Sequence, residues 1–221
     1  MSEESKIRAV KVTDEAGRQQ ALSVYKVIYC QEKNWVGDES KMFDAADLKD
    51  DNVSWFVALS GDRPVGVLRV LYALPMDLYK QYGFKMLEGS FDLDAFVREN
   101  KIAEIGRFAV LPEERRNIMV AGMLMKAAVK DTVERGFTHY VTDIFEGEEH
   151  SPYLFHTRVM GFVPVATHDV GELNCPNRRI TMVLDIAACY RKLKKSSGWI
   201  FRILTGDWSE ELHRKLKKGT D

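Results

Sequence analysis

The chain has 221 residues, of which 45% are hydrophobic and 29% are charged, and its 32 Lys and Arg nearly balance its 33 Asp and Glu. This composition is typical of a globular protein with one substantial core, and the charge balance argues against a nucleic-acid-binding protein. Cys30, Cys175 and Cys189 stand far apart without a paired metal-ligand spacing, so we predict no metal site and a reducing, cytoplasmic setting.

Hydrophobic periodicity predicts strands and helices in alternation. Expected strands cover residues 7–12, 54–59, 65–72, 103–110, 138–145, 162–170 and 178–186. Expected helices cover residues 14–32, 118–135 and 151–160, and helical patterns also occur within 76–87 and 92–100. Thr13 offers an N-cap to the first helix, while Gly136 and Gly161 follow the ends of two later ones. The turn at 60–64 predicts an antiparallel hairpin with a longer connection.

This order of elements implies an α/β fold in which helices cover both faces of a sheet. We expect one domain over residues 1–190 and a basic amphipathic extension over 191–221. The extension holds nine Lys or Arg against four Asp or Glu, so its net charge is +5. Its apolar residues either fold back onto the domain, meet an acidic carrier protein, or make peripheral contact with an anionic membrane.

Two charged residues interrupt an otherwise apolar strand at IAEIGRFAV. Glu104 and Arg107 are followed by a turn containing Arg115 and Arg116, and then by an apolar, Ala-containing helix. The first amides of a helix lack intrahelical partners, so a strand that leads through a basic turn into a helix can bind an anion such as a phosphate. A strand built only for packing needs neither charge, so the segment is a candidate reaction centre.

The segment EIGRFAVLPEERRNIMVAGMLMKAAVKDTVERGFTHYV, followed by FHTRVMGFVPV, resembles the GNAT acyltransferase superfamily. Within it, the chain is similar to acyl-homoserine-lactone (autoinducer) synthases and to long-chain N-acyl amino acid synthases. That likeness covers about residues 20–165 and includes VYKVIYCQEKNW, Asp44 in MFDAAD, Arg69 in GVLRV and the Glu-x-x-Arg-Phe of EIGRF. It implies a mixed, mostly antiparallel central sheet with helices on both faces.

The resemblance implies an enzyme that moves an acyl chain, medium or long, from an acyl carrier protein (ACP) or acyl-coenzyme A (CoA) thioester to the amine of a small molecule such as an amino acid. No tightly bound cofactor is expected, since the thioester is a co-substrate. The implied catalytic residues are Glu104, Arg107 and His156. The implied donor-binding residues are Phe108, Ala109, Val110, Arg115, Arg116, Asn117 and Ala121, and the implied acceptor-binding residues are Asp44 and Arg69.

In this mechanism Glu104 accepts the proton of the attacking amine, and His156 or Tyr153 protonates the departing thiolate. Backbone N–H groups between Phe108 and Val110 polarise the thioester carbonyl. Arg69 and Arg107 hold an acceptor carboxylate or order the acidic connection before the hairpin.

Three departures from the family pattern bear on the chemistry. In the phosphate-binding turn the family pattern is Arg/Gln-x-x-Gly-x-Gly/Ala, and RNIMVA places Met119 at the first glycine and Ala121 at the second. A side chain there hinders close approach of a diphosphate, which favours a carrier-protein donor over CoA. Tyr25 stands where autoinducer synthases have an arginine, which argues against lactone formation. Thr157, next to His156, stands where many GNAT enzymes have a general-acid tyrosine.

Structural roles remain open for the same residues. Arg107 could form an ion pair with Asp44 or Asp47, Arg69 could be an outward strand charge, and His156 could be a satisfied core histidine. Two other functions also remain open: an acetyl-CoA-dependent N-acetyltransferase, and a GNAT-fold regulatory module that binds acyl groups or carriers without turnover.

Overall fold

The computed structural model describes residues 6–37, 42–73, 81–89, 92–148, 151–196 and 198–217. The backbone forms two compact units. Unit 1 comprises residues 1–72, 105–131 and 202–206, and unit 2 comprises residues 73–104, 132–201 and 207–221. Strand β5 (Ile102–Val110) is shared between the units: residues 102–104 belong to unit 2 and residues 105–110 to unit 1. Helix α4 (Ile118–Glu134) is also shared, and its part in unit 1 ends at Asp131.

The sheet of unit 1 has the strand order β1-β2-β3-β5. Its first three strands are β1 (Ile7–Lys11), β2 (Val53–Ser60) and β3 (Arg63–Leu71), and the pairs β1/β2 and β2/β3 are antiparallel. Ser60 pairs directly with Arg63, so only two residues connect the hairpin, fewer than the sequence predicted. Gly61 has a φ of 62°, the left-handed conformation that such tight turns require.

Helix α1 (Glu15–Tyr25) continues without a break into η1 (Lys26–Glu32), whose hydrogen bonds follow the wider π-helical pattern. The N-cap of α1 is Asp14, whose carboxylate accepts the Gly17 N–H over 2.8 Å, so the prediction of Thr13 as the cap is wrong. Unit 1 also has short 3₁₀ helices at η3 (Ala45–Lys49) and η4 (Pro112–Glu114).

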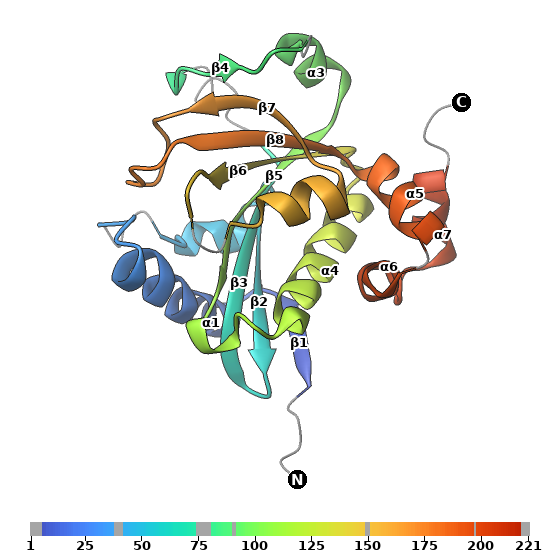
Figure 1. Ribbon diagram of the computed structural model, residues 1–221. Coiled ribbons are helices and arrows are strands. Elements are labelled where there is room, and N and C mark those ends of the chain that lie inside the picture. The colour runs from blue at the N-terminus through green and yellow to red at the C-terminus, as the bar shows by residue number, and fades with distance from the viewer. Residues whose placement is uncertain are drawn as a thin grey trace. The chain divides into compact units, whose positions relative to one another are not determined.

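Helices α1 and α4 pack on opposite faces of the sheet of unit 1. On one face, Tyr25 of α1 meets the ring of Trp55 on β2 at 5.9 Å. On the other, a Cβ added to Gly66 of β3 would come within 2.9 Å of Val120 and 3.0 Å of Leu124. Gly66 therefore lets α4 approach the strand closely. The expected coverage of both sheet faces by helices is confirmed here (Figure 1).

Asp131, near the end of the part of α4 in unit 1, ties that helix to β1, to β2 and to the residue that follows β3. Its carboxylate accepts hydrogen bonds from Lys11 at 3.0 Å, Ser54 at 3.0 Å and the Tyr72 hydroxyl at 2.6 Å. Burial alone would raise the pKa of Asp131, but the hydrogen bonds from Tyr72, Lys11 and Ser54 and the charge of Lys11 outweigh it and lower the pKa. The ionised carboxylate is thus a structural anchor.

Unit 2 has the strand order β5-β6-β8-β7-β4. Its strands besides β5 are β4 (Lys85–Met86), β6 (His139–Phe145), β7 (Val163–His168) and β8 (Arg179–Asp185). The β5/β6 pair is parallel, and the β6/β8, β7/β8 and β4/β7 pairs are antiparallel. The helical pattern predicted over 76–87 is wrong at Lys85 and Met86, which pair with β7, and residues 76–80 lie outside the described residues.

The helices of unit 2 are α3 (Leu93–Glu99), the π-helical η5 (Phe155–Met160), α5 (Ile186–Ser196) and α7 (Glu210–Lys217), and both units contribute to α6 (Trp199–Thr205). Helices α5 and α7 lie side by side (Figure 1). The ring of Tyr190 stacks against that of Trp208, and its hydroxyl lies 2.9 Å from Nδ1 of His213. Leu212 and Leu216 are buried.

These elements confirm the predicted α/β fold with a mixed, mostly antiparallel sheet. Within the described ranges, no helix combines the length and apolar character needed to span a bilayer.

Candidate active site

An aromatic cluster fills the face of unit 1 that α1 and η1 cover. Tyr29 of η1 stacks on Tyr25 at 4.6 Å between ring centroids, and its ring lies 6.1 Å from that of Trp35. On the sheet side, Phe43 stacks on Trp55 at 4.5 Å with nearly parallel planes. All five rings are buried. The π-helical turn adds a residue per turn, and such turns frequently occur at functional sites.

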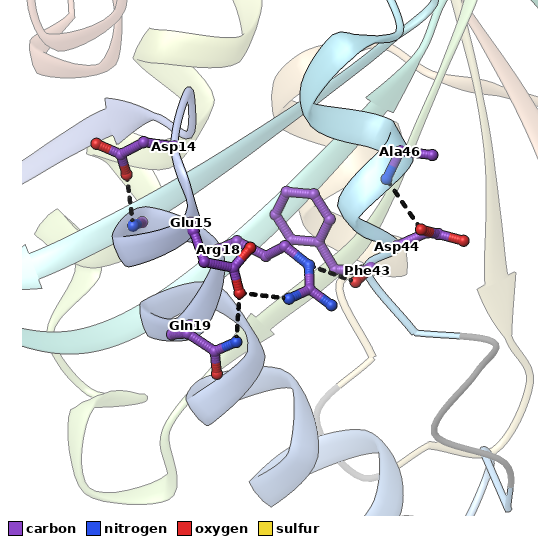
Figure 2. A network of polar contacts seen from close by, with 8 residues as sticks. Asp14, Glu15, Arg18, Gln19, Phe43, Asp44 and Ala46 are labelled. Atoms are coloured by element: carbon purple, nitrogen blue, oxygen red, sulfur yellow. Dashed lines mark hydrogen bonds and ion pairs between the residues drawn. The ribbon is translucent and has the colours of Figure 1, made fainter.

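Polar contacts from α1 fix the segment that carries Phe43 and Asp44 (Figure 2). The Arg18 Nε–H donates to the Phe43 carbonyl over 3.0 Å, and another guanidinium N–H donates to Glu15 over 2.7 Å. Asp44 Oδ1 accepts the Ala46 N–H over 2.9 Å and so caps η3. One oxygen of Asp44 therefore has a structural role, and the acceptor-binding role stays a prediction.

The two predicted arginines of unit 1 lie over rings of this cluster. The guanidinium carbon of Arg69 is 6.0 Å from the centre of the Trp55 ring, and that of Arg107 is 6.0 Å from the centre of the Tyr29 ring. Asp47 accepts the Trp55 indole N–H over 2.9 Å. Burial raises the pKa of Asp47, while the Trp55 hydrogen bond and the Arg69 charge oppose the rise. Arg69 thus acts electrostatically on an acidic residue of the connection before β2, and its acceptor-binding role stays a prediction.

Strand β5 departs from regular geometry at Arg107. Its φ of 49° lies in the left-handed region, which a non-glycine residue with a long side chain rarely adopts. At the next residue, the Phe108 carbonyl accepts the Tyr29 hydroxyl over 3.1 Å. Burial raises the pKa of Tyr29, although the nearby Arg107 charge opposes this, so the hydroxyl keeps its proton and remains a donor. Phe108 is 41% exposed, whereas Ala109 is buried.

The turn before α4 is braced by ion pairs. Arg63 of β3 bonds to Glu113 over 2.8 Å and also to Glu114, and Arg115 pairs with Glu32 at the end of η1. Arg116 is exposed, and the described residues provide no ion pair for it. Arg115 is therefore partly neutralised within the protein, which leaves Arg116 as the more available cation for a ligand phosphate.

Asn117 caps the start of α4. Its side-chain oxygen accepts the Met119 N–H over 3.2 Å, and its carbonyl accepts the Val120 N–H over 3.0 Å. A phosphate at this helix end would have to compete with the Asn117 side chain for the Met119 amide. Ile118 and Met119 are exposed, at 53% and 38%, so the helix end presents apolar side chains beside Arg116.

Unit 2 contains Glu104 and His156. Glu104 is half-buried on β5 and pairs in register with Val141 of β6. His156 Nδ1 lies 3.0 Å from the Pro152 carbonyl, so this nitrogen carries the proton and Nε2 has the lone pair. Burial lowers the pKa of His156, although that carbonyl opposes the shift. The ring is therefore neutral at neutral pH and can donate a proton from Nε2 only after taking one up.

Because η5 is π-helical, the residue that lies one helical turn before Gly161 is not the one expected for an α-helix. The Gly161 N–H bonds to the His156 carbonyl over 2.8 Å, five residues back, and Gly161 has a φ of 94°. The Thr157 hydroxyl instead donates to the Tyr153 carbonyl over 2.9 Å. In this register His156, rather than Thr157, stands one turn before the glycine.

Most of the predicted site residues lie in unit 1: Asp44, Arg69, Arg107, Phe108, Ala109, Val110, Arg115, Arg116, Asn117 and Ala121. Glu104 and His156 belong to unit 2. The sequence did not single out Tyr29, Trp35 and Trp55 as parts of this site, although the aromatic spacing in VYKVIYCQEKNW was a usable signal. Among the described residues, no group of His, Cys, Asp and Glu could hold a metal ion.

Comparison with solved structures shows the fold. FeeM, an N-acyl amino acid synthase from uncultured soil microbes, superposes with a TM-score of 0.64 at 18% identity, over 85% of this chain and 94% of FeeM. TofI, in a ternary complex with an inhibitor and MTA, gives 0.55 at 16% identity, over 85% of this chain and 95% of TofI. An aminoglycoside 6'-N-acetyltransferase complexed with coenzyme A superposes with a TM-score of 0.54 at 14% identity, over 82% of this chain and 97% of the acetyltransferase.

No curated protein matches the chain significantly. The sequence model of the acetyltransferase (GNAT) family matches residues 19–162, which is more than half of the chain and includes β5, α4 and η5. On this match and on the fold, the chain belongs to the acetyltransferase (GNAT) family.

Proposed function

We propose that this protein is an N-acyltransferase that moves a medium or long acyl chain from the thioester of an acyl carrier protein or CoA to the amine of a small molecule such as an amino acid. In the reaction the amine nitrogen forms a bond to the thioester carbonyl carbon, the carbon–sulfur bond breaks, and the proton lost by nitrogen ends on the thiol. Membership of the GNAT family supports an enzyme of this class.

The observation that carries the proposal is the irregular end of β5. The left-handed backbone of Arg107 and the Tyr29 hydrogen bond to Phe108 hold this strand in a geometry that costs free energy, of order 1–3 kcal/mol for such strain. Strain of this kind persists mainly where function uses it. Here it would set the backbone N–H groups between Phe108 and Val110 to polarise a thioester carbonyl.

Proton transfer requires a base because an α-amino group with a pKa of about 8 is mostly protonated at neutral pH. Glu104, half-buried on β5, is the proposed base, directly or through a water. His156 is neutral at neutral pH. It can therefore protonate the thiolate only if it first receives a proton during turnover, which makes it a relay rather than a preformed acid.

The start of α4 favours a carrier protein as the donor. Asn117 already occupies the Met119 amide, and the Met119 side chain stands where close approach of a diphosphate would need a smaller residue. The phosphopantetheine of a carrier protein has one phosphate, which Arg116 suits as the available cation. The exposed Ile118, Met119 and Phe108 add apolar area that a protein donor could cover.

On the acceptor side, Arg69 and Arg107 are the proposed partners of an acceptor carboxylate. Both lie against buried rings of unit 1, and both act electrostatically on the Tyr29 hydroxyl. Guanidinium groups bind carboxylates through two parallel hydrogen bonds, which suits an amino acid acceptor. Asp44 is the proposed acidic partner of the acceptor in the connection before β2. The similarity in fold to FeeM, an N-acyl amino acid synthase, supports this choice.

A second candidate is acetyl transfer from acetyl-CoA. The family description itself names acetyltransferases, and one structure of similar fold is an aminoglycoside 6'-N-acetyltransferase complexed with coenzyme A. This candidate differs from the first in the donor's acyl length and in the use of a free nucleotide.

The test is a matrix of donors and amine acceptors, with products identified by mass spectrometry. Donors run from acetyl to palmitoyl, each offered on CoA and on a carrier protein, and Glu104→Gln and Arg107→Ala serve as variants. We expect turnover with medium or long chains, preferably on the carrier, and about a 100-fold or larger loss in Glu104→Gln. Turnover with acetyl-CoA alone would select the second candidate, and a fully active Glu104→Gln would remove Glu104 as the base.

A further inference from the structure

Unit 2 contains an apolar pocket outside the aromatic cluster described above. Its volume is about 20 Å³. Its lining comes from strands β4 to β8, from helix α3 and from the residue that precedes β4: Phe84, Met86, Leu93, Phe96, Ile102, Val141, Val165, Ala166, Thr181 and Val183. Five of these ten residues are buried and four are half-buried, whereas Met86 is 43% exposed and marks an opening at the edge of the sheet.

Strand register places Glu104 beside this pocket. Side chains alternate between the two faces of a strand, so Glu104 shares a face of β5 with Ile102, two residues earlier. Glu104 also pairs in register with Val141 on the parallel neighbour β6. Ile102 and Val141 both line the pocket, so Glu104 begins at the border of the pocket, on the same face of the sheet.

A bulge in β7 shapes the opposite wall. Pro164 pairs with Met182 and Ala166 pairs with Thr181, so Val165 is an extra residue without a register partner. Consecutive residues of a regular strand face opposite sides, yet Val165 and Ala166 both line the pocket. The bulge therefore supplies two apolar side chains to one cavity, and bulges often re-aim side chains in this way beside active sites.

A second carboxylate lies near the same wall. Asp143 follows Val141 by two residues on β6 and accepts the hydroxyl of the pocket residue Thr181 over 2.7 Å. Its other oxygen is 3.2 Å from Nε2 of the buried His168. His168 is itself covered by the pocket residue Phe84, at 4.9 Å between rings. The carboxylate side chain is 22% exposed, so it can still attract a cation.

We infer that this pocket receives the apolar group carried by the amine acceptor. The inference rests on the proposed N-acyl transfer and names its acceptor class: an amine with a small, compact apolar group, such as a short branched alkyl chain. Glu104 at the border takes the amine proton, and the nearby Asp143 carboxylate attracts the ammonium form before that step. A long acyl tail does not fit, because the pocket, at about 20 Å³, is small.

Two matched pairs of variants isolate the pocket. Val183→Phe would fill it, and Ile180→Phe places the same side chain on the same strand from the opposite face, also at a half-buried position. Met86→Ala would widen the opening, and Leu87→Ala is its control, because Leu87 is 37% exposed and does not line the pocket. Thermal unfolding of each variant establishes that it is folded.

The measurements use methylamine, isobutylamine and phenethylamine on the full chain. Binding is followed by chemical-shift perturbation without any donor, and transfer is followed as kcat/KM with a fixed thioester. We expect isobutylamine to be preferred over methylamine by about 10-fold or more, since each methylene in an apolar pocket contributes about 10- to 200-fold. Val183→Phe should abolish that preference, Met86→Ala should shift it toward phenethylamine, and both controls should retain the wild-type order.

The outcomes separate this inference from the proposed function. If no thioester supports transfer but isobutylamine binds to the wild type and not to Val183→Phe, the pocket is an amine site and acyl transfer is refuted. If transfer occurs but a folded Val183→Phe keeps the wild-type order of amines, the pocket inference is wrong while acyl transfer stands. Absence of both isobutylamine binding and discrimination among amines in the wild type would also overturn the inference.

Discussion

The Tyr29 hydroxyl donates a 3.1 Å hydrogen bond to the Phe108 carbonyl, across 79 positions of the sequence. This bond joins the π-helical η1 to β5 immediately after the left-handed Arg107, whose guanidinium lies over the same tyrosine ring. One buried side chain thus supports both the irregular strand and the arginine that we propose binds the acceptor.

Replacing Tyr29 with Phe tests that support. The variant loses one hydrogen bond and should lower the free energy of unfolding by about 1 kcal/mol, because the carbonyl loses its partner in a partly buried setting. The rate of acyl transfer should decrease by more than the loss of folded protein accounts for, because the Phe108 carbonyl is no longer fixed by the hydrogen bond. Tyr190→Phe, which removes a hydroxyl near His213 in unit 2, is the control. Equal transfer rates in the two folded variants would contradict a role for the Tyr29 bond.

Substitutions at Arg107 separate backbone strain from charge. Glycine accepts a φ of 49° without a steric penalty, whereas alanine does not, so Arg107→Gly should be about 1 kcal/mol more stable than Arg107→Ala. Both variants lack the guanidinium and should lose transfer to amino acid acceptors alike. Urea unfolding and steady-state kinetics measure the two effects. A more stable alanine variant would mean that Arg107 does not hold the left-handed conformation in solution.

Stability should decrease in mild acid because of two histidines. Burial lowers the pKa of His139 and of His156 below the usual 6.5, although Asp185 opposes the shift at His139 and a backbone carbonyl opposes it at His156. The unfolded chain therefore binds protons first as pH falls, so the free energy of unfolding drops below about pH 6.5. Chemical denaturation across this range measures the slope.

A variant identifies the source of that slope. His156→Gln should flatten the pH dependence of unfolding below about 6.5, whereas Asp131→Asn should leave this window unchanged. The Asp131 carboxyl has a pKa lowered from 3.8, so its contribution is lost only in stronger acid. An unchanged slope in His156→Gln would show that its imidazole is not shielded from solvent.

Met119 should control the choice between the two kinds of donor. Met119→Gly removes the side chain that stands at the start of α4, so the KM for acyl-CoA should fall while that for the acyl carrier protein does not. Ile118→Gly, at a neighbouring position with 53% exposure, controls for the effect of glycine on the helix end. A parallel change in KM for both donors in Met119→Gly would argue against discrimination at this position.

The sequence predicted the regular elements well because their patterns are local. The apolar run at 103–110 and the β-branched and aromatic run at 138–145 were predicted as strands and correspond to β5 and β6. Gly136 and Gly161 follow the ends of helical segments, as expected, and both have left-handed conformations. The predicted N-cap, Thr13, was wrong because Thr13 and its neighbour Asp14 can both cap a helix. The sequence pattern does not show which of two such adjacent residues is the cap.

The irregular features could not be predicted from the sequence, because tertiary contacts determine them. The seven residues of η1 are too few for their apolar pattern to distinguish a π-helix from an α-helix. The residues next to Arg107 in the sequence give no sign of its positive φ. In the structure, the guanidinium of Arg107 lies over the ring of Tyr29, which is far away in the sequence. The pocket beside Glu104 depends on the bulge at Val165, which only the pairing of β7 with β8 reveals.

The most direct test of acyl transfer to an amine is a single-turnover experiment with a radiolabelled decanoyl carrier protein and a mixture of amino acids. We expect label to move into an N-acyl amide, free thiol to appear in equal amount, and Glu104→Gln to slow both together. Hydrolysis to free fatty acid without amide, or label that remains on the carrier, would contradict it.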